Sequence, residues 1–163
     1  MAFDDTLKLV DAAFTFNEQT NVYPNANQNG FHTSPNNISL GRTGLPKGAQ
    51  FAVILDNPGG ETSATGLNCH LQLTLDNGGT WRTIATVEFG DPGDAFQGIR
   101  VVDIAQDFDA QEYADANIDI RMQVEPAGSN ASNNITADKL AAFITQGESQ
   151  KFGRKKTADT LFV

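Results

Sequence analysis

Residues 118–125 read Ile-Asp-Ile-Arg-Met-Gln-Val-Glu, so apolar and polar residues alternate at every step. Successive side chains of a β-strand point to opposite faces, and strict alternation is typical of a strand with one face on a core and one on solvent. Residues 69–75, Cys-His-Leu-Gln-Leu-Thr-Leu, repeat the pattern. Both segments are therefore predicted to be half-buried strands.

A turn follows the second of these strands, at Asp76-Asn77-Gly78-Gly79. Residues 74–81 match the pattern [ST]-x-D-x-G-x-T-W, which resembles the Asp-box hairpin of sialidase-like propellers. The resemblance implies that Asp76 accepts hydrogen bonds from turn amides, that Gly78 takes a positive φ, and that Trp81 packs beneath the turn. These three residues are predicted to fix a hairpin and to perform no chemistry.

The strand after this turn is predicted to place Trp81 on the apolar face together with Ala85, Val87 and Phe89, and hence to bury its ring. Run 49–55 is apolar on both faces and is predicted to be a central strand. The remaining segments predicted to be strands are 6–16, 38–40, 99–104 and 138–146. A break near Asp11 is the alternative for the first of these segments, and a short helix is the alternative for the last.

Residues 17–37 are rich in Asn, Gln and Pro and are predicted to form one long polar loop. Residues 107–117 are predicted to be an acidic connection, and 91–98 a loop. The hydrophobic pattern of the chain predicts seven or eight strands, without the alternation of strands and helices that is typical of βαβ units. We therefore predict an all-β, antiparallel two-sheet sandwich, jelly-roll-like, with an immunoglobulin topology as the alternative.

Composition limits the kind of protein. The chain has 163 residues, which suits one domain, and a formal charge of −9. Residues 147–163 carry four of the eleven basic residues and two of the twenty acidic ones, so this segment has a charge of +2 and residues 1–146 have −11. An acidic body repels phosphate, which argues against nucleic acid as a partner. We expect a sandwich domain at 1–146 and a basic C-terminal arm at 147–163.

The arm ends in apolar residues after its basic run. A frayed tail is one interpretation. We favour an arm that orders on a neighbouring protein, with basic side chains on an acidic surface and the apolar end in a groove. The candidate partner-binding residues are Lys151, Phe152, Arg154, Lys155, Lys156, Leu161, Phe162 and Val163.

Nucleophilic catalysis needs a Ser or Cys beside a base, and the histidines are His32 and His70. His70 adjoins Cys69, but neighbours on a strand face opposite ways, so we expect Cys69 in the core and His70 on the solvent face. The acidic residues 107–115 lack the glycine and final glutamate of a helix-loop-helix calcium site. No catalytic, cofactor-binding or metal-binding residue is predicted, and we do not expect an enzyme.

The start of the chain has no secretion signal, and no apolar run is long enough to span a bilayer. A single cysteine allows no internal disulfide. We expect a protein made in the cytoplasm, with no membrane partner.

Four stretches together resemble the small cement or decoration proteins that stabilise the heads of tailed bacteriophages, above all the jelly-roll cement type of short-tailed phages. They are residues 5–12 (Asp-Thr-Leu-Lys-Leu-Val-Asp-Ala), the loop with Tyr23-Pro24, residues 48–55 and residues 71–75. The resemblance covers roughly residues 5–145. It implies a virion protein, a homo-oligomer (dimer or trimer) on the outside of a shell of major capsid protein, made in the host cytoplasm and without catalytic residues.

A carbohydrate- or ligand-binding β-sandwich is the alternative, with Trp81, Tyr23 and Tyr113 as candidate sugar contacts. Trp81 discriminates between the two hypotheses, because a sugar platform needs an exposed ring whereas the apolar pattern predicts a buried one.

Overall fold

The structure, a computed structural model, describes residues 8–16, 23–25, 30–32, 37–41, 45, 48–59, 66–76, 78–90, 98–104, 118–127 and 135–146. Every regular element among these residues is a β-strand. The strands are β1 (Lys8–Phe16), β2 (Tyr23–Asn25), β3 (Gly30–His32), β4 (Ile38–Gly41), β5 (Ala49–Gly59), β6 (Gly66–Thr74), β7 (Arg82–Phe89), β8 (Gly98–Asp103), β9 (Ile118–Ala127) and β10 (Ile135–Gln146).

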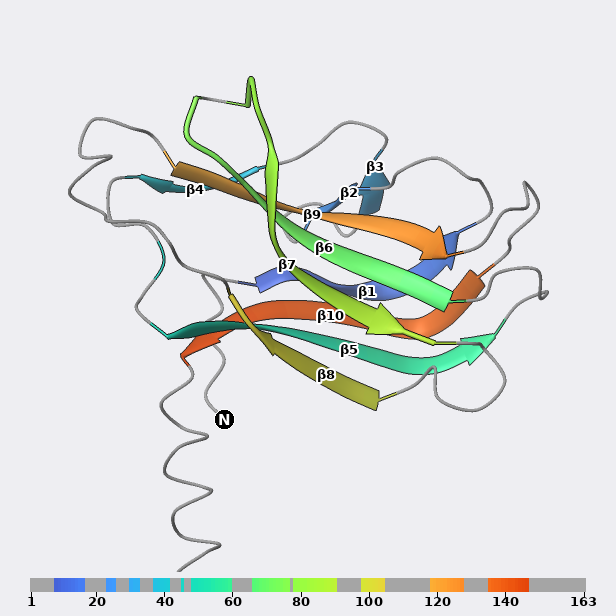
Figure 1. The fold of residues 1–163 in the computed structure, drawn as a ribbon. Helices are drawn as coiled ribbons and strands as arrows, with labels where there is room; N and C mark the ends of the chain where they lie inside the picture. Colours follow the sequence, from blue (N-terminus) through green and yellow to red (C-terminus); the bar gives the residue numbers. More distant parts are fainter. Residues whose placement is uncertain are drawn as a thin grey trace, which may run out of the picture.

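Two four-stranded antiparallel sheets pack face to face (Figure 1). Sheet A has the strand order β1-β10-β5-β8, and sheet B has the order β4-β9-β6-β7. The short hairpin β2–β3 is separate from both sheets. The predicted all-β two-sheet sandwich is therefore confirmed.

The pairing of the strands is nested. Apart from the β2–β3 hairpin, β6 pairs with β7, β5 with β8, β4 with β9 and β1 with β10. One long antiparallel ribbon is thus rolled up, and the pairs β10·β5 and β6·β9 close it into two sheets. This is a jelly roll. An immunoglobulin sandwich has several hairpins within its sheets. Among the strands that the structure describes, only the β6–β7 hairpin joins consecutive strands of one main sheet, so that alternative is wrong.

The core lies between the sheets and is filled by alternate residues of the inner strands. Its largest fully buried side chains are Phe51, Leu55, Leu67, Leu71, Phe89, Ile120, Met122 and Leu140. Burial of each such side chain contributes about 1.5–3 kcal/mol relative to exposure. Strand β5 lies between β10 and β8, as expected of a central strand, and Phe51 and Ala52 on its opposite faces are both fully buried.

The segment predicted as one polar loop, 17–37, contains the hairpin of β2 and β3, so that prediction is wrong in part. Strand β4 pairs only with residues 118–120 of β9, which leaves the rest of that edge without a strand partner among the described residues. Strand β2 lies close to both β9 and β1 (Figure 1). The hairpin therefore covers one side of the sandwich, where the edges of the two sheets meet.

Residues 138–146, for which a helix was the alternative, lie in the long strand β10. Strand β1 is continuous, but its register to β10 shifts on each side of Asp11, near the predicted break. Both segments therefore belong to sheet A.

Candidate interaction surfaces

Asp76 holds the turn between β6 and β7. The Thr74 hydroxyl donates a hydrogen bond to its Oδ1 at 2.6 Å, and the Thr80 amide donates to the same oxygen at 2.8 Å. Because both bonds favour the ionised carboxylate, the Thr74 bond most, the pKa of Asp76 falls to about 2. Gly78 has a φ of +91°, which side chains rarely tolerate. The predicted roles of Asp76 and Gly78 in the hairpin are confirmed.

Trp81 lies on the outer face of sheet B, so the prediction that it shares the core face with the later apolar residues of β7 is wrong. The register between β6 and β7 shifts between Leu71 and Gln72, and Ile84 is the extra residue on β7. One extra residue reverses the face taken by every side chain beyond it. The bulge at Ile84 therefore turns Trp81 outward.

The Trp81 ring is half-buried where it lies. The Arg121 guanidinium stands over one face of the ring, 4.0 Å from its centroid. Gly78 meets the ring edge, because a Cβ there would lie 3.8 Å from both Cζ2 and Nε1. The indole packs beneath the turn as predicted, but it is not a fully exposed platform.

Arg121 also anchors a hydrogen-bonded row across two strands of sheet B, β6 and β9. Its Nε donates to Oε1 of Gln72 at 2.7 Å, and Nε2 of Gln72 donates to Oε1 of Gln123 at 2.6 Å. All three residues are less than 10% exposed although they lie on the outer face, since their long side chains cover one another. We call Gln72, Arg121 and Gln123 the glutamine row. The sequence pattern predicted the outward direction of these side chains but not their burial.

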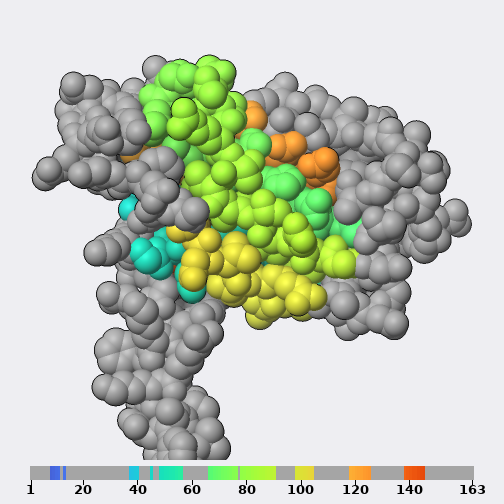
Figure 2. All heavy atoms as spheres, in the orientation of Figure 1, coloured from blue at the N-terminus to red at the C-terminus, as the bar shows by residue number. Residues whose placement is uncertain are grey.

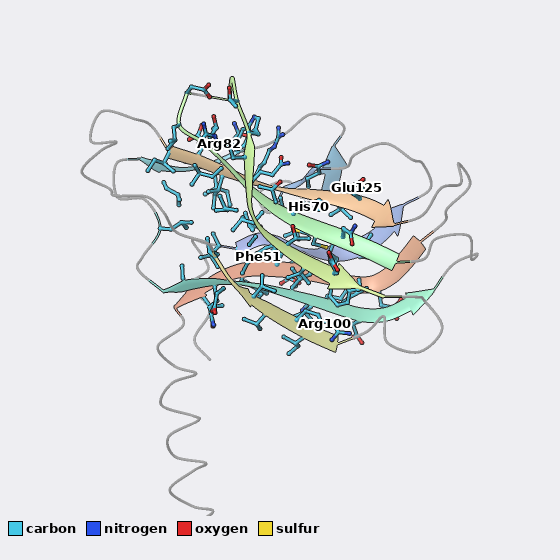
Figure 3. All side chains as sticks on the ribbon, viewed as in Figure 1. Phe51, His70, Arg82, Arg100 and Glu125 are labelled. Carbon is cyan, nitrogen blue, oxygen red and sulfur yellow. The ribbon has the colours of Figure 1, made fainter. Side chains whose placement is uncertain are left out.

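His70 lies beside this row on the same outer face (Figure 3). Its Nδ1 is 2.9 Å from Oγ1 of Thr86, and its Nε2 is 3.1 Å from Oε2 of Glu125. Cys69 points the other way and is fully buried, which raises the pKa of its thiol. As predicted, the two residues face opposite sides of the sheet, and they form no Cys–His dyad.

The outer face of sheet A differs, because it carries apolar side chains near its β8 edge. Ile99 of β8 is 61% exposed and is the single large hydrophobic residue of the described chain with an exposed side chain. Ile54 pairs directly with Ile99 across β5 and β8, and Val101 follows on the same face; both are half-buried. We call Ile54, Ile99 and Val101 the apolar strip.

A shallow depression of about 310 Å³ adjoins this strip. Ile54, Leu55 and Gly98 line it together with the oppositely charged Asp56 and Lys139. Lys139 also pairs with Asp11 at 3.2 Å. The surface is therefore an apolar patch with charged residues at its rim, a composition typical of contacts between proteins.

Among the described residues, no three His, Cys, Asp or Glu side chains cluster closely enough to hold a metal ion. The part of the chain that the structure describes contains no helix with the length and apolar character needed to cross a bilayer. Several predicted segments lie outside the described residues: the partner-binding arm 147–163, the acidic residues 107–117 with Tyr113, and loop residues 91–97. For Tyr23 and His32 the backbone is described, in β2 and β3.

No protein family, no curated protein and no solved structure matches the chain. Any function therefore has to be inferred from the outer faces of the two sheets. Sheet B carries the glutamine row there, and sheet A carries the apolar strip.

Proposed function

We propose that this protein is a structural virion protein, a cement or decoration protein that binds the outside of a phage capsid and stabilises it. The observation that carries the proposal is the apolar strip of Ile54, Ile99 and Val101 on the outer face of sheet A. An isoleucine left 61% exposed on a regular strand contributes little to the folded monomer, whereas burial against a partner recovers about 25 cal/mol per Å² of apolar area.

The position of the strip on strands supports the same function. Ile54 lies on the interior strand β5, and the hydrogen-bonded ladders of sheet A hold its backbone on both sides. A surface of this kind is preorganised, so little conformational entropy is lost when a partner binds. A cement protein repeats such a contact at many equivalent positions of a shell, where modest single interfaces add up to strong attachment.

Co-sedimentation with empty, expanded phage heads tests the proposal. We expect saturable binding with a symmetric copy number, and Ile99→Lys should weaken it by about 10- to 100-fold, because a charge then has to be buried in an apolar contact. Ala13→Lys is the matched control, since Ala13 is exposed on β1 at the opposite edge of the same sheet. Absence of binding by the folded protein, or equal binding by both variants, would overturn the proposal.

The basic arm at 147–163 is proposed as a second attachment element. Its four basic residues oppose the charge of an otherwise acidic chain, and its end is apolar. Deletion of residues 147–163 should weaken attachment to heads at physiological salt. Unchanged attachment would show that the strip binds without the arm.

A carbohydrate-binding sandwich is the second candidate, and the outward position of Trp81 favours it. The Arg121 guanidinium already occupies one face of the ring, which reduces the area available for a sugar. Trp81 is the one tryptophan of the chain, so its fluorescence reports directly on this site. We expect no change on titration with a panel of oligosaccharides; a saturable change would favour the second candidate.

A further inference from the structure

Four strands form the edges of the two sheets: β1 and β8 in sheet A, and β4 and β7 in sheet B. An edge strand presents a row of backbone N–H and C=O groups that can pair with another chain. Proteins that do not use such an edge commonly protect it with a bulge, a proline, a charge or a short strand.

Three of the four edges are irregular. The register of β1 to β10 shifts twice, that of β4 to β9 shifts between Ser39 and Gly41, and that of β7 to β6 shifts at the Ile84 bulge. Strand β8 differs, because its six residues pair with β5 in unbroken register and include no proline. Strand β8 is thus the one regular edge of the described sandwich.

The direction of the backbone groups on β8 follows from its ladder. The Ile104 amide donates to the Ala49 carbonyl at 3.2 Å, just beyond the end of the strand. In an antiparallel ladder every second residue is hydrogen-bonded to the neighbouring strand, so the groups of even-numbered β8 residues face β5. The N–H and C=O groups of Ile99, Val101 and Asp103 therefore face away from sheet A.

We propose that β8 pairs antiparallel with β8 of a second copy of this chain, about a two-fold axis at Val101. Val101 then faces Val101 of the second copy, and Ile99 faces Asp103. This register uses all three outward-facing residues of each copy and forms about six hydrogen bonds, two for each facing pair. A shift by one residue in each copy loses one facing pair, and the shift centred on Arg100 places two guanidinium groups opposite each other.

The side chains of β8 are compatible with this pairing. The Asp103 carboxylate accepts a hydrogen bond from Nε2 of Gln50 at 2.7 Å and is thus held against its own sheet. Arg100 lies over the Phe89 ring of its own β7, 5.8 Å from the centroid. Figure 2 shows the atoms of β8, in yellow, at the near surface of the molecule below those of β7.

The result is a continuous eight-stranded sheet in which the two copies of sheet A are joined edge to edge. Pairing occupies the edge of the sheet and leaves its outer face free, so the apolar strips of the two copies, each including Ile99, merge into one surface across the axis. The pairing does not depend on whether a capsid is the partner, and it can be measured in solution without one.

A cysteine at the axis tests the register. In a hydrogen-bonded antiparallel pair the facing Cα atoms lie about 5.5 Å apart, within the range of a disulfide. Under mild oxidation Val101→Cys should give a covalent dimer. Ile99→Cys is the matched control, because its counterpart lies about 13 Å away along the strand and should not cross-link. The native Cys69 is fully buried and does not interfere.

A proline at the axis tests the edge itself. Val101→Pro removes an N–H that faces outward and keeps the ladder to β5, so the circular dichroism should stay unchanged while the dimer dissociates. Light scattering should give the mass of a dimer for the wild-type protein and of a monomer for the variant. A monomeric wild-type protein, or equal cross-linking through positions 99 and 101, would overturn the proposal while leaving capsid binding open to its own test.

Discussion

The Arg121 guanidinium lies 4.0 Å from the centroid of the Trp81 ring, and through Nε it donates a hydrogen bond to Gln72 at 2.7 Å. One cation thus links the Asp-box hairpin to the glutamine row on the outer face of sheet B. The same contact determines how much of Trp81 is available to a ligand.

Arg121→Ala should lower the free energy of unfolding by about 1–3 kcal/mol, because Gln72 loses a charged donor in a place where water is largely excluded. It should also shift the Trp81 emission to longer wavelength, since one face of the ring becomes wet. Urea unfolding followed by circular dichroism measures the first effect. Arg82→Ala is the control, an exposed arginine next to Trp81 in sequence, and an equal loss there would contradict the role of Arg121.

Asp76 should make stability depend on pH in the acid range. Its pKa falls from the usual 3.8 to about 2 in the folded protein, so the folded chain releases this proton more readily than the unfolded chain does. The resulting stabilisation is present above pH 3.8 and is lost as the pH falls towards 2. Wild-type protein and Asp76→Asn should therefore differ at neutral pH and converge between pH 4 and pH 2 in urea unfolding.

Thr74→Ala is the companion variant in this experiment, because the Thr74 hydroxyl is the strongest of the hydrogen bonds that lower the pKa of Asp76. Its stability should respond less to pH than that of the wild-type protein. A constant difference between wild type and Asp76→Asn over the whole range would refute this account of the turn.

Phe51 lies at the centre of the core on β5 and is fully buried. Phe51→Ala should cost about 3–5 kcal/mol of unfolding free energy, the loss of buried area plus the cavity that remains. Glu88→Ala, at an exposed position of β7, should change it by less than about 0.5 kcal/mol. Thermal or urea unfolding measures the stability of both variants. A small loss of stability in Phe51→Ala would contradict the position of Phe51 in the core.

Cys69 should be inert towards thiol reagents in the native protein. It is fully buried, and burial raises the pKa of its thiol, so both access and thiolate are lacking. Labelling with a maleimide at neutral pH should be complete in denaturant and negligible without it. Rapid native labelling would mean that β6 opens frequently.

The sequence allowed the strands and the class of fold to be predicted, because alternation at residues 69–75 and 118–125 is a local property. The face of Trp81 could not be obtained in the same way. A single inserted residue, Ile84, reverses the alternation, and a bulge has no signature in the local pattern.

The apolar strip was missed for a related reason. Ile99 and Val101 read as ordinary alternate residues of a strand, and their exposure follows from the position of β8 at the edge of sheet A. Edge position depends on which distant strands pair, here β8 with β5 and β10 with both β5 and β1. Local periodicity carries no information about pairing at that range.

The nested order of the strands also constrains how the chain folds during synthesis. Among the nested pairs, the β6–β7 hairpin closes the shortest loop, and each further pair then closes a loop already shortened by the one inside it. Strand β10, the last of the described strands to be synthesised, lies between β1 and β5, so β1 lacks its ladder until residues 135–146 have been made. A chain shortened to end before Ile135 therefore contains all four strands of sheet B but lacks the second strand of sheet A.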